Sequence, residues 1–351
     1  MPETQYLRKW KLIISPSTQD VYSKSSGFLS SYTKISEKTL KDFKDNGKVV
    51  PRSVEATVFE DPLRVEFTAT KKALADSNNA EITLWNISPE LESKLLMEGA
   101  EVILEAGYES GNYGVIFKGV IIQPLRGKSN GTDYYLKLIC LSEDNFWNLG
   151  FIEGTVAVNT KRKELIQQVL RSSYTGNTLQ VEDTESINTN VVDGSNTALE
   201  RPKVLFGNPR EFIRNAAKMS NVSPFIEDNK MKFISFNEEL PKYLHTVNIN
   251  TGMIGSPIQS NEYVNVKVLM NSSIKLGDYI QIDNSTVSIQ QMRNIQDLTY
   301  LLDADGIYKV IGITYEGDSR GTSWYTTLQA ISKNGRIAAP LTNGKGELLV
   351  L

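Results

Sequence analysis

Alternating apolar and polar residues recur through the first 145 positions of the chain and predict a series of short β-strands. Gly, Asn and Asp, which are typical of turns, separate these strands. One short helix is expected from Pro89 to about Glu98, because Ser88 is a favourable N-cap, Pro suits the first helical position and Gly99 ends the run. The expected strands cover residues 6–14, 54–59, 63–69, 80–86, 101–106, 115–123 and 133–141.

The pattern changes after Trp147 and indicates a small α/β module. Residues 161–172 predict an amphipathic helix, and residues 208–211 resemble a capping box that opens a second one. A hairpin that turns at residues 228–229 is expected next, whereas the polar tract 176–200 suits an exposed loop. The apolar faces of the two helices consist of Leu165, Ile166, Val169 and Leu170, and of Phe212, Ile213, Ala216 and Ala217.

Strands return after residue 246, and they are expected at 263–270, 278–282, 306–315 and 322–331. The chain is therefore predicted to be mainly β with an α+β component. Its predicted parts are a first small β-barrel at 1–147, an α/β module at 148–245, a second small β-barrel at 246–335 and a C-terminal tail at 336–351. Residues 15–53, rich in Ser, Thr and Lys, are expected to form a long excursion, since connections of this length are usually functional or disordered.

The two β regions contain segments that align without a gap. Residues 131–142 can be laid on residues 321–332, with Gly, Thr, Tyr, Leu and the final Ser in common. The alignment also preserves side-chain parity and places Cys140 on Ala330. We interpret it as an internal repeat; the alternative is that two unrelated hairpins look this alike.

A repeat of this kind has a geometric consequence. Two similar barrels in one chain can occupy successive positions around one axis, so three chains would supply about six near-equivalent positions. A trimer could in this way match a sixfold tube.

Composition narrows the classes of function. The chain has 351 residues and a net charge of -3, from 38 Lys+Arg and 41 Asp+Glu, so it lacks the basic excess expected of a protein that grips nucleic-acid phosphates. A single cysteine excludes an intrachain disulfide. The sequence shows neither an apolar signal core at its start nor a membrane span, so synthesis and assembly in a reducing cytoplasm are expected.

Candidate chemistry is sparse. Residues 317–321 read Gly-Asp-Ser-Arg-Gly and match the G-x-S-x-G motif, but a nucleophile elbow needs a helix after the serine, and here a strand-like segment follows. The only histidine, His245, precedes that serine, contrary to the usual hydrolase order. A hairpin turn at 317–321 and a structural or surface role for His245 are therefore expected.

Other polar and reactive residues are also expected to be structural. Cys140 is predicted to fill a small apolar site, and the four tryptophans to lie in the core or in interfaces. Lys161-Arg162-Lys163 could be a solvated helix start or an interaction patch. The acids at 182–185 and 303–305 suit loops better than a cation site or an acid–base pair, and 344–346 lacks the spacing of a phosphate loop. No catalytic, cofactor-binding or metal-binding residue is predicted.

Several short segments, taken in order, resemble a known family. They are LRKWKL at 7–12, EITLWNISP at 81–89, AGY at 106–108, VIFKG at 115–119, GTD at 131–133, TGMIGSP at 251–257 and IKLGDYI at 274–280. Each is weakly specific, but their order and spacing across most of the chain resemble the baseplate hub proteins of contractile-tailed phages, including the Mu-type hub. The excursion at 15–53 departs from the compact form of that pattern.

The resemblance implies a structural, non-enzymatic subunit without cofactors. It implies a homotrimer whose tube-like barrels form a pseudo-sixfold ring between the tail tube and the central spike of a virion, with a lumen through which DNA passes without specific binding. The tail tube protein, the spike and other baseplate proteins would be its partners. The alternatives are a hub or spike subunit of a related contractile injection system, or a cell-wall-degrading tail enzyme that uses two carboxylates.

Overall fold

The structure is a computed structural model of the 351-residue chain. It describes residues 7–15, 56–73, 77–95, 99–129, 131–142, 144–148, 150–173, 180–181, 198–219, 222–227, 230–235, 243–259, 263–283, 287–289 and 306–332. The predicted excursion at 15–53, apart from Ser15, and the tail at 336–351 lie outside this part of the chain. The fold is mainly β, as the alternating pattern predicts.

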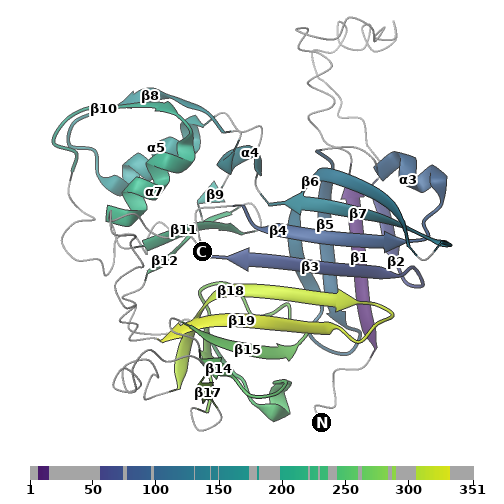
Figure 1. The fold of residues 1–351 in the computed structure, drawn as a ribbon. Coiled ribbons are helices and arrows are strands. Elements are labelled where there is room, and N and C mark those ends of the chain that lie inside the picture. The colour runs from purple at the N-terminus through teal and green to yellow at the C-terminus, as the bar shows by residue number, and fades with distance from the viewer. Residues whose placement is uncertain are drawn as a thin grey trace, which may run out of the picture.

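The N-terminal strands form a first β unit. Its elements are β1 (Arg8–Ser15), β2 (Thr57–Glu60), β3 (Val65–Lys72), β4 (Asn79–Trp85), α3 (Pro89–Leu95), β5 (Glu101–Tyr108), β6 (Gly114–Ser129) and β7 (Asp133–Leu141). The strands pair in the order β3-β4-β7-β6-β5-β1-β2. Figure 1 shows that β1, β2 and β5 run across β3, β4 and β7, so the curved sheet encloses the apolar face of each strand.

The C-terminal strands form a second β unit. Its elements are β13 (Leu244–Thr246), the 3-10 turn η1 (Ile249–Thr251), β14 (Ile258–Gln259), β15 (Val264–Leu269), β16 (Tyr279–Gln281), β17 (Ser288–Ile289), β18 (Ile307–Asp318) and β19 (Trp324–Ser332). Here β14, β15, β19, β18, β16 and β13 are neighbours in that order. The order matches β3-β4-β7-β6-β5-β1 of the first unit, except that β13 is parallel to β16 whereas β1 is antiparallel to β5.

The registers of the two units confirm the repeat. Ala80 lies opposite Cys140 in the first unit, and Val264 lies opposite Ala330 in the second. The neighbouring ladder is interrupted at the same place in both. In the first unit the pairing skips Ile122, between Ile121 opposite Cys140 and Gln123 opposite Ile139. In the second it skips Ile311, between Val310 opposite Ala330 and Gly312 opposite Gln329. A shared β-bulge is a strong sign of common design, because a bulge fixes register and bends the strand.

A glycine beside the bulge is also shared. Gly99 has a φ of 81° and donates its N–H to the carbonyl oxygen of Ile121 at 2.7 Å. Gly277 has a φ of 88° and donates in the same way to Val310 at 2.9 Å. Since L side chains rarely adopt such a φ, both positions favour glycine. Each bulge is thus held by the same backbone contact.

The α/β module lies between the two units in sequence and to one side of the sheet in Figure 1. Leu165, Ile213 and Phe146 belong to its own apolar core, and the predicted amphipathic faces point inward. Two predictions were incomplete, since the short strand β9 lies inside the tract expected to be loop, and the β8–β10 ribbon was not foreseen. The module contains α4 (Asp144–Trp147), β8 (Ile152–Val156), α5 (Arg162–Ser172), β9 (Gln180–Val181), β10 (Lys203–Gly207), α7 (Pro209–Met219), β11 (Val222–Glu227) and β12 (Lys230–Ser235).

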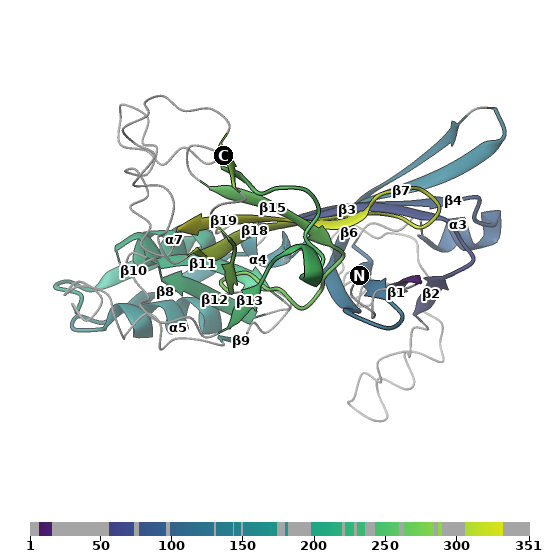
Figure 2. The same ribbon diagram turned by 90° about the horizontal axis from the view of Figure 1, so that it is seen from below.

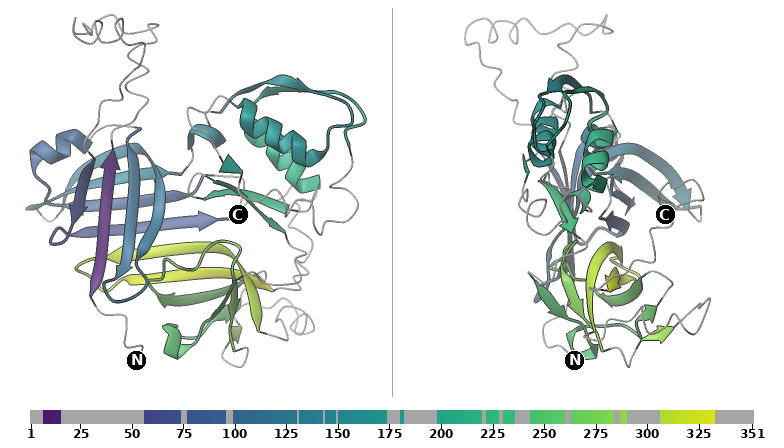
Figure 3. Two further views of the ribbon diagram at one scale, coloured as in Figure 1. Left: turned by 180° about the vertical axis from the view of Figure 1, so that it is seen from behind. Right: turned by 90° about the vertical axis from the view of Figure 1, so that its left-hand side faces the viewer.

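The two β units are joined edge to edge into one 14-stranded sheet, and their buried side chains form one core. Strand β18 belongs to the second unit but also pairs with β3 of the first. Figure 3 shows β18 lying directly beside β3, with β19 on the far side of β18. The division of the chain at residues 147, 245 and 335 stays a prediction.

Candidate functional site: the junction between the two β units

The two β units meet along half of one strand. Residues Ile307–Lys309 of β18 pair with β16 of their own unit, whereas Gly312–Asp318 pair with Lys72–Glu66 of β3. The change of partner occurs at the bulge, where the carbonyl oxygen of Ile311 accepts the N–H of Ala73 at 2.9 Å. The bulge therefore both bends β18 and directs its second half onto the first unit.

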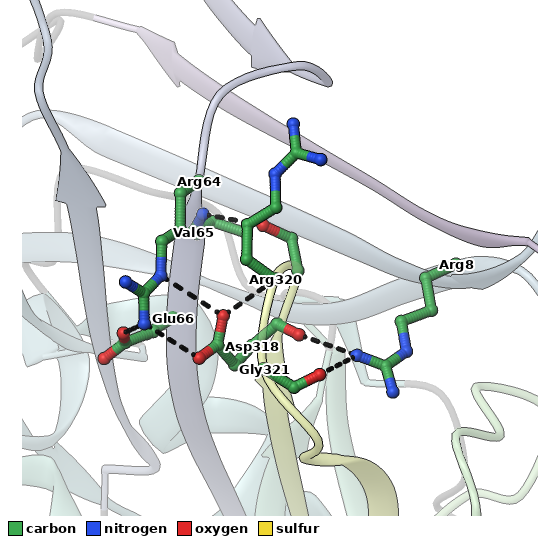
Figure 4. Close-up of polar contacts among 8 residues, drawn as sticks. Arg8, Arg64, Val65, Glu66, Asp318, Arg320 and Gly321 are labelled. Atoms are coloured by element: carbon green, nitrogen blue, oxygen red, sulfur yellow. Dashed lines mark hydrogen bonds and ion pairs between the residues drawn. The ribbon is translucent and has the colours of Figure 1, made fainter.

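A polar cluster closes the far end of this ladder (Figure 4). The guanidinium of Arg64 donates to both carboxylate oxygens of Asp318, at 3.4 Å from Nε and 3.0 Å from Nη2, and it also contacts Glu66. From the other side, Nη1 of Arg8 donates to the carbonyl oxygens of Asp318 at 3.0 Å and Gly321 at 2.5 Å. Two arginines of the first unit thus hold the β18–β19 turn of the second.

The ionisation of Asp318 favours this contact. Partial burial would raise the pKa of its carboxyl, but hydrogen bonds from Arg64 and from the backbone amides of Arg320 and Gly321 outweigh burial and lower the pKa. The carboxylate is therefore stable as the charged partner of Arg64 at neutral pH.

Aromatic side chains seal the same end of the junction. Trp324 is 3% exposed, and its indole N–H donates to the carbonyl oxygen of Gly107 in β5 at 3.1 Å. The ring of Phe67 packs edge-on against it with 5.5 Å between centroids. The second hairpin is in this way inserted into the first unit, with its polar tip outside and its tryptophan inside.

A buried ion cluster ties the α/β module to the other end of β3. The ammonium of Lys71 lies 3.3 Å from one oxygen of Glu227, and that of Lys232 lies 3.2 Å from the other. Burial opposes ionisation of Glu227, but the charges of Lys71, Lys232 and Lys275 hold the pKa of its carboxyl below the ordinary value. Removing one member of such a cluster leaves a buried charge without its partner, which is costly.

The family of the chain follows from a comparison that spans these three parts. Residues 48–330 match the model of a family described as baseplate hub gp41. The match runs from β2 through the module to β19, and so includes the junction apart from Arg8 of β1. The chain belongs to the baseplate hub gp41 family.

Solved structures resemble this hub chain in fold at low sequence identity. A PdpA–VgrG complex from Francisella, in its lidded form, matches with a TM-score of 0.50 and 7% identity, over 95% of this chain and 54% of that chain. The 43 kDa tail protein of prophage MuSo2 from Shewanella oneidensis matches with a TM-score of 0.49 and 8% identity, over 79% of this chain and 94% of that one. A tail protein from Neisseria meningitidis MC58 matches with a TM-score of 0.47 and 10% identity, over 78% and 98%. No curated protein sequence matches the hub chain.

The serine motif of the hub is a turn, as predicted. The hydroxyl oxygen of Ser319 accepts the N–H of Val65 at 3.1 Å, and the Ser319 N–H donates to the Val65 carbonyl oxygen at 2.9 Å. Strand β19 follows the motif where a nucleophile elbow would have a helix. Ser319 therefore serves the junction.

The other singled-out residues lie apart from one another. His245 is in β13, and its Nε2 lies 3.2 Å from an oxygen of Asp278. Cys140 is fully buried at the position equivalent to Ala330, and burial raises the pKa of its thiol to about 12. Lys161 precedes α5, where Glu164 accepts its backbone N–H. The acids at 182–185 and 303–305 and the glycines at 344–346 lie outside the described residues.

In the described part of the chain, the acidic, histidine and cysteine side chains form no group of three or more that could hold a metal ion. None of its helices is long and apolar enough to cross a membrane.

Sequence reasoning missed the residues that make the junction. Arg8, Arg64 and Asp318 lie far apart in the chain, and nothing in their local pattern pairs them. The usable signal was the acidic Asp318 at the tip of the second hairpin, where the gapless alignment places the basic Lys128 of the first hairpin.

Proposed function

We propose that the chain is the structural hub subunit of a contractile phage tail, and that three copies form a pseudo-sixfold ring that joins the tail tube to the central spike. The observation that carries this proposal is the repeat, with its shared bulge and shared glycine. A chain that contains two equivalent units and closes with threefold symmetry presents about six equivalent positions to a tube. The work of such a subunit is geometric rather than catalytic.

The lumen of this ring would admit DNA without gripping it. The chain carries 38 basic and 41 acidic side chains, so a strongly basic bore is not expected. Phosphate contacts would slow a genome that must slide through. We expect the inner surface to be neutral to acidic.

The α/β module supplies a surface for the spike or for neighbouring baseplate proteins. Val204 and Phe206 of β10 are each 69% exposed, and the ring of Phe151 packs against that of Phe206 with 5.3 Å between centroids. Exposed aromatic groups of this kind are characteristic of protein interfaces. For such a subunit we expect assembly in the host cytoplasm and incorporation into the tail baseplate of the virion.

Native mass spectrometry of the purified chain, alone and with its spike protein, tests the ring. We expect a species with the mass of three chains, and a spike that joins it without changing that number. Dimers or tetramers as the closed species would contradict the proposal. Activity of the pure protein on peptidoglycan, lost on substitution of an acidic residue, would instead favour a wall-degrading enzyme.

A further inference from the structure

Because of the repeat, the surroundings of the β6–β7 hairpin can be compared directly with those of the β18–β19 hairpin. We call Gln123–Ser129 of β6 with Tyr134 and Tyr135 of β7 the first arm, and Gly312–Asp318 of β18 with Trp324 and Tyr325 of β19 the second arm. They are equivalent by register, since each begins directly after the shared bulge. The second arm lies on β3. Figure 2 shows the first arm projecting from the body of the molecule.

The first arm has an open edge. Within the described residues, β6 beyond its bulge pairs only with β7. Gly99 reaches the Ile121 carbonyl oxygen on the side away from β7, and the bulge places Ile122 on that side too. From there on, alternate residues direct their backbone groups at the open edge, namely Pro124, Arg126 and Lys128. In the second arm the equivalent residues direct their backbone groups at β3.

The first arm exposes apolar as well as charged side chains. Leu125 is 38% exposed and Tyr134 is 50% exposed, and Ile122, at the bulge directly before the arm, is 36% exposed. The residue equivalent to Tyr134 is Trp324, which is 3% exposed because the first unit covers it. An open strand edge with apolar side chains is a template for pairing with another strand.

We propose that the first arm docks on the second β unit of a neighbouring copy of the chain, and so repeats between chains the contact that the second arm makes within one chain. This inference rests on the proposed ring and names its contact surface. Strand β14 holds the place of β3, since Gln259 opposite Val264 corresponds to Ala69 opposite Ala80. By the register of β18 on β3, Lys128 would lie opposite Pro257, as Gly317 lies opposite Phe67.

Two features set the strength of this contact. In the isolated chain the outer edge of β14 carries β17, through only two residue pairs. The incoming arm would replace this short ladder. Pro124 and Pro257 each lack an N–H, so the ladder between chains has fewer hydrogen bonds than the ladder within a chain. Assembly is therefore expected to be reversible and to depend on protein concentration.

Disulfide trapping between two differently tagged chains tests the contact. One chain carries Lys128→Cys and the other carries Pro257→Cys, a position that is buried in the isolated chain and that the arm would reach on replacing β17. The native Cys140 lies inside the core, away from both positions, and does not compete. Mild oxidation of the mixture is expected to give a covalent dimer containing both tags, whereas either variant alone gives none. Lys118→Cys, in the half of β6 that pairs with β5, is the matched control and is expected to give no dimer with Pro257→Cys.

A second measurement keeps the test independent of cysteine geometry. Leu125→Glu should leave the thermal midpoint of the monomer unchanged and raise the concentration for half-dissociation about tenfold or more. Val58→Glu, on the exposed edge strand β2, is the control and should leave assembly unchanged.

The outcomes separate this inference from the proposed function. Trimers that form without the mixed disulfide, and that ignore Leu125→Glu, overturn the arm contact and leave the ring standing. Disulfide dimers of Lys128→Cys alone reveal a symmetric contact and overturn the head-to-tail arrangement. A chain that stays monomeric at every concentration and yields no mixed disulfide overturns both.

Discussion

The first and second arms have the same strand register but different neighbours. Each follows the same bulge and the same backbone contact from a glycine. After the bulge their side chains diverge: Ile313 and Tyr315, which are buried, correspond to Pro124 and Arg126 of the first arm. The bulge and the backbone contact from the glycine fix the path of the strand, whereas the neighbour that covers the arm determines which side chains it carries.

The divergence also explains why the chains do not pair indiscriminately through open strand edges. The second arm is closed by β3, the Arg64–Asp318 pair and the buried Trp324. The first arm carries Pro124, Arg126 and Lys128 along its open edge, and proline and basic residues are typical means of restricting edge pairing. The arm is thus open to a partner of the right geometry and unfavourable for indiscriminate pairing.

Truncating the equivalent aromatic residues should show the largest difference between the two arms. Trp324→Ala removes a buried indole and its hydrogen bond to Gly107, so the free energy of unfolding should fall by about 3–5 kcal/mol. Tyr134→Ala changes an exposed side chain and should stay within about 0.5 kcal/mol. Denaturant unfolding of the monomer, followed by circular dichroism, measures both. Similar losses at the two sites would mean that the first arm is already covered in a single chain.

Alanine at the paired glycines should show what the two units share. Gly99→Ala and Gly277→Ala each force a side chain into a left-handed conformation, which should cost about 1–2 kcal/mol at either site. Gly154→Ala is the control, because a Cβ there meets open space and should change stability by less than about 0.5 kcal/mol. Thermal or denaturant unfolding gives the three values. A large loss at only one of the paired glycines would argue against equivalent bulges.

Much of the fold could be predicted from local patterns. Alternation located the strands of the first unit and β15, β16, β18 and β19 of the second, but not the short strands β13, β14 and β17. The alignment of residues 131–142 with 321–332 located the repeat. The bulge at Ile122 and Ile311 escaped prediction, because one extra residue in a long apolar strand leaves no compositional mark. The β8–β10 ribbon escaped for another reason: its exposed Val204 and Phe206 obscure the alternation that a half-buried strand usually shows.

The junction could not be predicted in the same way. Pairing of β18 with β3 joins residues about 250 positions apart, and strand propensity carries no information about such partners. Asp318 illustrates the point, since it lies in a turn motif whose local chemistry suggested only a hairpin tip. Asp318 is a junction residue because Arg64, from the other β unit, donates to its carboxylate.

Asp318 provides the smallest and most selective distinction between the two arms. Its pKa is lowered in the folded chain despite partial burial, so its contribution to stability is fully present above the unfolded pKa of about 4 and is lost as pH falls through the lower folded value. Asp318→Asn should therefore cost about 1 kcal/mol or less at pH 7, because the side chain of Arg64 is 42% exposed and solvent screens the pair.

The pH dependence distinguishes a charge effect from a steric one. The stability difference between wild type and Asp318→Asn should shrink as the pH falls below about 4 towards the lowered folded pKa, because the unfolded chain takes up its proton first and the folded carboxyl loses its charge last. Asp133→Asn, at the exposed start of β7 in the first hairpin, keeps an oxygen to accept the amide of Asn86 and is the comparison variant in that hairpin. Denaturant unfolding at several pH values gives both profiles. A difference for Asp318→Asn that persists unchanged at low pH would show that the second arm is held by shape alone, and that the Arg64–Asp318 pair contributes nothing to its closure.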